Sequence, residues 1–104
     1  MPNDTQNKTK VTKLNRGDVV YIATFNHPAI VLKNCDGFSI ACSITSDSEC
    51  REILEPCRSR MFPNSYITKN LFTISAPCEQ LQLRGLYDNN RHLDKVYEKL
   101  KLIL

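Results

Sequence analysis

The spacing of the strand-like segments is the feature that most restricts the fold of this chain. Three segments rich in β-branched, aromatic and aliphatic residues follow one another closely: RGDVVYIATF, AIVLK and FSIACSITS. Only NHP separates the first two, and a tight turn containing Asp36-Gly37 separates the next two. A parallel crossover needs a dozen or more residues, whereas a hairpin needs only a few. The short connections therefore predict antiparallel strands.

The third segment, residues 38–46, has the clearest pattern. Apolar residues alternate there with small or hydroxyl-bearing residues, the apolar ones being Phe38, Ile40, Cys42 and Ile44. Successive side chains of a strand point to opposite faces of the sheet. We therefore expect one face of this strand in the core. The opposite face, with its hydroxyl groups, is expected either to be covered by another element or to form the floor of a groove.

The second half of the chain predicts further strands and one helix. Residues 47–64 are expected to be mostly loop, with a short strand near REILEP, and 65–75 to be a strand interrupted near Lys69-Asn70. A short extended piece and a turn at Gly85 follow. From about residue 91 to 104, apolar residues recur at helical spacing, namely Leu93, Val96, Tyr97, Leu100, Ile103 and Leu104. Asp88, Asn89 or Asn90 is expected to cap this helix.

These elements predict a mainly β domain with a C-terminal α-helix. Four or five closely spaced strands favour a small curled antiparallel sheet or a partly open barrel, with the helix packed against it. We assign residues 16–104 to this single domain. Residues 1–15 are polar and carry three lysines, and we interpret them as a flexible basic tail.

Composition excludes several classes of protein and leaves others open. No apolar run approaches the roughly 20 residues of a membrane-spanning helix, and the N-terminus lacks the apolar core of a signal peptide. We therefore expect a cytoplasmic protein with no membrane partner. The 5 cysteines are odd in number and include no CxxC pair, so neither a zinc site nor a disulfide scaffold is indicated. The net charge of +3 is compatible with a polyanionic partner without requiring one.

The order of these segments resembles that of the MazF/PemK family of toxin endoribonucleases. The resemblance rests on RGDVVYI, HPAIVL, FSIACSITS and the terminal LRGLYDNNRHLDKVYEKLKLIL, and it spans roughly residues 16–104. The opening and the Ile44-Thr45-Ser46 end of the third segment are its most specific parts. Residues 47–64 do not follow the family pattern.

The resemblance implies a fold, an activity and partners. It implies a small SH3-like, MazF-type antiparallel barrel that forms a homodimer and cleaves single-stranded RNA without a metal or other cofactor. It also implies a cognate antitoxin protein that covers the RNA groove. In the family, an arginine before the proline of the second strand and a Thr or Ser ending the third strand act in catalysis. His27 stands at the arginine position here, and Thr45 with Ser46 at the other.

These residue types suit the chemistry of RNA cleavage. Attack of a 2′-OH on the adjacent phosphorus needs a base, an acid for the 5′ leaving oxygen and donors for the phosphorane charge. Histidine is the side chain that titrates nearest neutral pH, so His27 is the candidate acid or base. Thr45 and Ser46 are candidate hydrogen-bond donors. Positive charge for RNA binding is expected from Arg16, Arg58, Arg60 or Lys69.

Each of these residues also has an ordinary structural explanation. A histidine before a proline in a loop is often solvated, Thr45 suits any exposed strand face, and the CRSR arginines suit a solvated loop. The alternative function is a non-catalytic module on the same fold, binding RNA or, as in the CcdB toxins that share this architecture, a protein target such as DNA gyrase. Fold alone does not decide between these functions.

Overall fold

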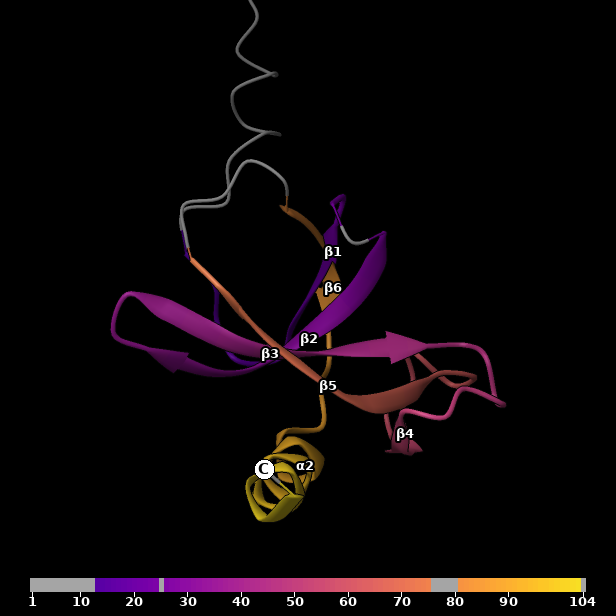
Figure 1. The fold of residues 1–104 in the computed structure, drawn as a ribbon. Helices are drawn as coiled ribbons and strands as arrows, with labels where there is room; N and C mark the ends of the chain where they lie inside the picture. The colour runs from indigo at the N-terminus through magenta and orange to yellow at the C-terminus, as the bar shows by residue number, and fades with distance from the viewer. Residues whose placement is uncertain (1–12, 25, 76–80, 104) are drawn as a thin grey trace, which may run out of the picture.

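The computed structural model describes residues 13–24, 26–75 and 81–103, which form one sheet and one helix (Figure 1). The elements are β1 (Asp18–Ile22), β2 (His27–Cys35), β3 (Phe38–Thr45), β4 (Ile53–Pro56), β5 (Tyr66–Ile74), β6 (Leu81–Leu86) and α2 (Asn90–Ile103). The mainly β architecture with a C-terminal helix is confirmed. Of the expected tail, only residues 13–15 lie within the described part.

The sheet is antiparallel and open, with the strand order β4-β5-β3-β2-β1-β6. The two expected hairpins, β1–β2 and β2–β3, are present. The expectation of a barrel is corrected, because β4 and β6 form the two edges and no pairing joins them within the described residues. β4 has only 4 residues and pairs with β5, whereas β6 pairs along β1.

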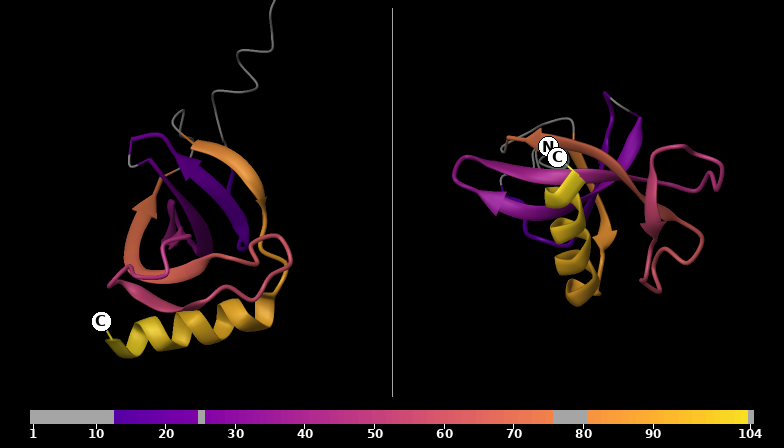
Figure 2. Two further views of the ribbon diagram at one scale, coloured as in Figure 1. Left: turned by 90° about the vertical axis from the view of Figure 1, so that its right-hand side faces the viewer. Right: turned by 60° about the horizontal axis from the view of Figure 1, so that its bottom comes forward.

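The sheet buries apolar side chains on both of its faces. One cluster contains Val19, Ile30 and Leu32 together with three residues of α2, and the other contains Val20, Ala29 and Val31. The left view of Figure 2 shows why both faces are covered: the sheet curls upon itself, and α2 lies beneath it. Leu14, from the expected tail, is 4% exposed and belongs to the second cluster.

The prediction of which side chains of 38–46 are buried is wrong in part, because the sheet is curled. Cys42 and Ile44 lie in the helix-side cluster as expected, but Phe38 is 39% exposed, and Ser39 is buried. Ala41, on the face predicted to carry hydroxyl groups, packs in the second cluster. The hydroxyl face is therefore covered along the first half of β3 and reaches a groove only at its end.

Two irregularities in strand pairing replace breaks that the sequence suggested. β5 is one continuous strand, and its pairing with β3 shifts between Cys42 and Ile44, opposite the expected interruption near Lys69. Gly85 lies inside β6 and does not form a turn. Beside it, the pairing of β6 with β1 shifts between Val19 and Val20. Such bulges re-aim the side chains beside them.

The helix follows its predicted pattern except at its end. Asn89 Oδ1 accepts a hydrogen bond of 3.0 Å from the His92 N–H, so Asn89 is the cap among the three candidates. The stripe residues Leu93, Val96 and Leu100 are buried. Ile103 is 53% exposed, because α2 extends past the sheet, and Leu104 lies outside the described residues. None of the described helices is long and apolar enough to cross a membrane.

Gly17, in the RGD opening, joins three segments. Its N–H donates to the Val31 carbonyl at 2.8 Å, and its carbonyl accepts from the Tyr87 N–H at 2.7 Å. Its φ of 92° is favoured only for glycine, and an added Cβ would lie 3.1 Å from the backbone carbonyl oxygen of Tyr87. This glycine thus allows the start of the domain to pack against the connection between β6 and α2.

Candidate functional site

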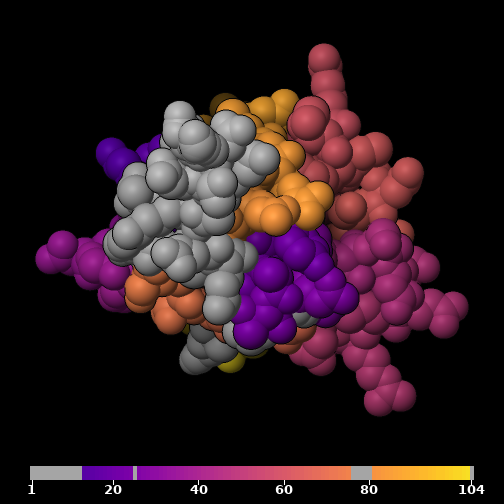
Figure 3. Space-filling model, turned by 90° about the horizontal axis from the view of Figure 1, so that it is seen from above, coloured from indigo at the N-terminus to yellow at the C-terminus, as the bar shows by residue number. Residues whose placement is uncertain are grey.

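The structure brings His27, Thr45 and Ser46 to one groove with a volume of about 620 Å³. We call it the His27 groove. Its walls come from β1, the start of β2, the end of β3, β6 and the loop before β5, and Figure 3 shows these segments meeting on one face of the molecule. The lining residues are Val19, Tyr21, His27, Pro28, Ile44, Thr45, Ser46, Phe62, Ser65 and Arg84.

His27 is the first residue of β2 and not a loop residue. It pairs with Ile22 of β1 across the hairpin, so the backbone of the strand fixes its position while its side chain stays exposed. The turn before it contains Asn26 with a φ of 57°, and the Asn26 side chain accepts a hydrogen bond from the Tyr21 hydroxyl. The hairpin end is thus held in place, and it presents the imidazole to the groove.

Thr45 and Ser46 face the groove from the end of β3. Thr45 pairs with Tyr66 of β5 and is half-buried, and its Oγ1 accepts a 3.1 Å hydrogen bond from the Asp47 N–H. Its own O–H proton therefore remains available for a ligand. Ser46 is exposed. Two hydroxyl donors and one imidazole line the same groove, which is the arrangement the sequence motifs predicted.

Arg84 supplies the positive charge of the groove and was not among the predicted residues. It lies at the β1–β6 bulge, its Cζ sits 4.7 Å from the centroid of the Tyr21 ring, and its Nη2 donates to Gln82 at 3.1 Å. It forms no ion pair with a described carboxylate. The signal was present in the sequence, as one arginine inside the apolar run LQLRGL, but only the bulge aims it into the groove.

The four cations predicted to bind RNA lie outside the His27 groove. Arg16 forms a 2.5 Å ion pair with Asp94 and donates to the Asn90 carbonyl at 2.6 Å, so it fastens the start of the domain to α2. Arg60 is exposed in the loop before β5, and Lys69 is exposed on β5. Arg58 lines a separate groove beside α2.

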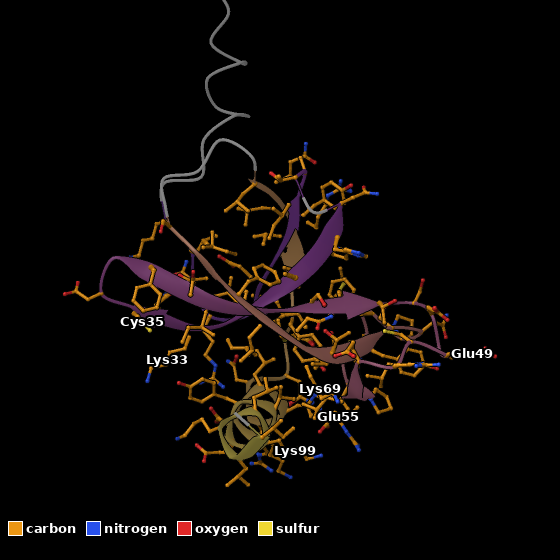
Figure 4. The ribbon with its side chains drawn as sticks, viewed as in Figure 1. Lys33, Cys35, Glu49, Glu55, Lys69 and Lys99 are labelled. Carbon is orange, nitrogen blue, oxygen red and sulfur yellow. The ribbon has the colours of Figure 1, made fainter. Side chains whose placement is uncertain are left out.

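A buried polar network beneath that second groove was also missed by sequence reasoning. The Tyr87 hydroxyl accepts from the Arg58 N–H at 2.5 Å and lies 2.7 Å from His92 Nδ1. His92 Nε2 contacts Glu55, whose second oxygen accepts from Lys99 Nζ at 2.5 Å. Figure 4 shows Glu55 of β4 beside Lys99 of α2. The network joins β4, the loop of residues 57–65 between β4 and β5, and α2.

Two pKa values in this network are displaced for physical reasons. Burial raises the pKa of Tyr87 to about 12, so its hydroxyl stays protonated. Burial also acts to raise the pKa of the Glu55 carboxyl, but hydrogen bonds from Lys99 and His92 outweigh it and hold that pKa below its ordinary value. Glu55 is therefore the anion of this network at neutral pH.

No group of three or more His, Cys, Asp or Glu side chains that could hold a metal ion occurs among the described residues. No protein-family model matches the chain, and no curated protein matches it.

Proposed function

We propose that this protein is an endoribonuclease of the mRNA-interferase toxin type, cleaving single-stranded RNA by attack of a 2′-OH, without a metal. The observation that carries the proposal is the meeting of His27, Thr45 and Arg84 in one groove. His27 and Thr45 lie at the open end of the β2–β3 hairpin, and Arg84 comes from β6, far away in the sequence. An imidazole, hydroxyl donors and a guanidinium can supply the base, the acid and the hydrogen-bond donors that this reaction needs.

The chemistry is assigned residue by residue. His27 accepts the proton of the 2′-OH while the 2′ oxygen attacks the phosphorus. The resulting imidazolium then donates a proton to the 5′ oxygen as the P–O5′ bond breaks. Arg84 and the hydroxyl groups of Thr45 and Ser46 donate hydrogen bonds to the phosphorane oxygens. The products are a 2′,3′-cyclic phosphate and a 5′-OH. Pro28 and Phe62 are half-buried and form an apolar part of the wall against which a base can pack.

The experiment is cleavage of a mixed-sequence single-stranded RNA in EDTA by wild type, His27→Ala and Thr45→Ala. Wild type is expected to cut and leave 2′,3′-cyclic ends. His27→Ala is expected to lose about 10²–10⁴ in rate, the usual contribution of acid–base catalysis. The matched chemical control is the same oligonucleotide with 2′-deoxy sugars, which cannot react by this route.

Two results would contradict the proposal. Cleavage that survives in both folded variants would remove the assigned site. If folded wild type does not cut at all, the activity itself is excluded for this substrate, and the alternative of a non-catalytic module binding RNA or a protein target becomes the better explanation. Circular dichroism of each variant establishes that it is folded.

A homodimer and a cognate antitoxin belong to the same proposal. β6 is an edge strand that exposes Leu83 by 58% and Leu86 by 54%, with Met61 of the neighbouring loop 59% exposed. Apolar residues on a sheet edge suit pairing with a second chain. Sedimentation equilibrium of wild type against Leu83→Lys tests the dimer: the variant is expected to shift toward monomer, and an unchanged mass would exclude this edge as the interface.

A further inference from the structure

Arg58, Arg91, Lys95 and Lys99 line a groove of about 290 Å³ between α2 and the loop that follows β4. We call it the Arg58 groove. Glu55 is the one carboxylate in its wall, and that carboxylate is occupied by His92 and Lys99. Arg58, Arg91 and Lys95 form no ion pair with any described residue. Three exposed and uncompensated cations therefore converge on one concave surface.

The groove is built on a fixed base. The Asn89 side chain donates to the Arg58 carbonyl at 3.0 Å, and the Tyr87 hydroxyl accepts from the Arg58 N–H, so the backbone that carries this guanidinium is held on both sides. Arg91 and Lys95 lie four residues apart, on one face of α2. A ligand therefore meets charges from two elements whose separation the buried network sets. Two of the three charges are guanidiniums, which bind phosphate oxygens in bidentate fashion.

The rings of Phe62, Tyr87 and His92 lie in a row between this groove and the His27 groove. Phe62 lines the His27 groove, and its ring stacks on Tyr87 with centroids 6.4 Å apart. The Tyr87 ring lies 6.0 Å from His92, which lines the Arg58 groove. The two grooves thus lie on either side of one row of three rings.

We propose that the Arg58 groove binds the phosphate backbone of single-stranded RNA next to the segment held in the His27 groove. This inference rests on the proposed function for its choice of ligand. It assigns the groove a positioning role: the cations hold the strand without reading its bases, because phosphate contacts carry no sequence information. An acidic protein segment is the competing occupant, and adjacency to the His27 groove favours RNA.

The test measures binding separately from cleavage. The probe is a fluorescein-labelled, mixed-sequence 2′-O-methyl RNA of about 12 nucleotides, a length within the usual single-strand site size, which cannot be cut by 2′-OH attack. Anisotropy titrations at several salt concentrations compare wild type with Arg58→Gln/Arg91→Gln/Lys95→Gln. The matched control is Lys33→Gln/Arg51→Gln/Lys101→Gln, which removes the same charge from exposed sites outside both grooves.

The proposal expects the groove variant to bind at least tenfold more weakly, with the salt slope of log K reduced by about 2, as the loss of three phosphate contacts predicts. The control is expected to stay within about twofold of wild type. Equal weakening in both variants, unchanged binding in the groove variant, or no binding by wild type would each overturn it. Unchanged binding would leave the groove to an acidic protein partner.

The outcome is separable from that of the proposed function. If wild type cuts natural RNA while the groove variant binds the probe normally, the nuclease assignment stands and this inference fails. If wild type does not cut but the groove variant loses binding, the nuclease assignment fails and the backbone-binding groove stands. The melting temperature of both triple variants is measured first. All six replaced side chains are exposed, and the control also loses the contacts of Lys33 and Lys101 with the Tyr97 ring and the ion pair of Lys101 with Glu98, so both variants are expected to melt within about 5 °C of wild type.

Discussion

The Tyr87 hydroxyl and His92 Nδ1 form a hydrogen bond of 2.7 Å between two buried side chains, five residues apart across the start of α2. The same hydroxyl accepts from the Arg58 N–H, so it donates its proton to His92 Nδ1, and His92 Nε2–H donates to Glu55. Every buried polar side-chain atom among the described residues has a partner. The Tyr87 hydroxyl thus connects the loop of residues 57–65 to α2.

Tyr87→Phe tests that connection. The substitution keeps the ring stacked on Phe62 but leaves His92 Nδ1 and the Arg58 N–H without their partner. We expect the free energy of unfolding to fall by about 1–3 kcal/mol, the usual cost of orphaned buried polar groups. Urea unfolding measures it. Tyr97→Phe is the control, because Tyr97 is half-buried and its hydroxyl makes no hydrogen bond within the described residues; equal losses in both variants would contradict the prediction.

The lowered pKa of Glu55 predicts a pH dependence of stability. A carboxyl whose pKa is lower in the folded state than its ordinary value of 4.5 stabilises the fold above that pH and loses this contribution as the pH falls through the folded-state pKa. We expect Glu55→Gln to cost about 1–3 kcal/mol at pH 7, since the side chain is 12% exposed. Below pH 4.5, the difference from wild type should shrink.

Unfolding free energies at pH 7 and at several values below pH 4.5 check this expectation. Glu98→Gln removes an exposed carboxylate paired with Lys101 and is expected to change stability by less than about 0.5 kcal/mol at every pH. A Glu55→Gln penalty that stays constant down to the lowest pH would show that the carboxylate charge is not what stabilises the network.

Arg84 is expected to act mainly on catalysis, since its contact with the Tyr21 ring at this exposed site contributes about 0.5–1 kcal/mol to stability. Arg84→Gln removes the guanidinium from the His27 groove, and we expect the cleavage rate to fall by about 10²–10³, as for loss of one preorganised donor to a developing anion. Arg84→Lys keeps the charge without the planar fork and is expected to recover only part of the rate. Single-turnover cleavage measures both. Arg51→Gln is the control, and a rate loss there as large as in Arg84→Gln would remove the assignment.

Cysteine reactivity follows burial. Burial raises the pKa of the Cys42 and Cys57 thiols to about 12: Cys42 is buried, and the half-buried Cys57 packs against the helix-side cluster. Cys35 and Cys50 are also half-buried, but they lie near turns. Because the thiolate is the reactive species, we expect iodoacetamide at pH 8 to modify Cys35 and Cys50 at least about tenfold faster than Cys42 and Cys57. Peptide mass spectrometry over time resolves the sites. Equal rates in native protein would contradict the burial of Cys42 in the helix-side cluster.

Much of the fold follows from local signals in the sequence. The short connections predicted the β1–β2 and β2–β3 hairpins, and the helical spacing of Leu93, Val96 and Leu100 predicted α2 and its buried face. These features depend on steric periodicity and loop length, which act within a few residues. The resemblance grouped His27, Thr45 and Ser46 as one candidate site, and all three line the His27 groove. Their catalytic role stays a prediction.

The tertiary structure decided what depends on pairing register and curl. The bulge opposite Val19 and Val20 aims Arg84 into the His27 groove. Gly85 in the run LQLRGL is compatible with a turn or a bulge, and only the pairing with β1 decides between them. The curl of the open sheet covers the first half of the hydroxyl face of β3. The sequence places His92 in the helix but does not show that its side chain is buried. The fold buries it and brings Tyr87 and Glu55 into hydrogen-bond contact with it. The alternation in the sequence predicts which side chains share a face of a strand, because that depends on local geometry. Pairing register and long-range packing determine which of those faces are buried and what they contact.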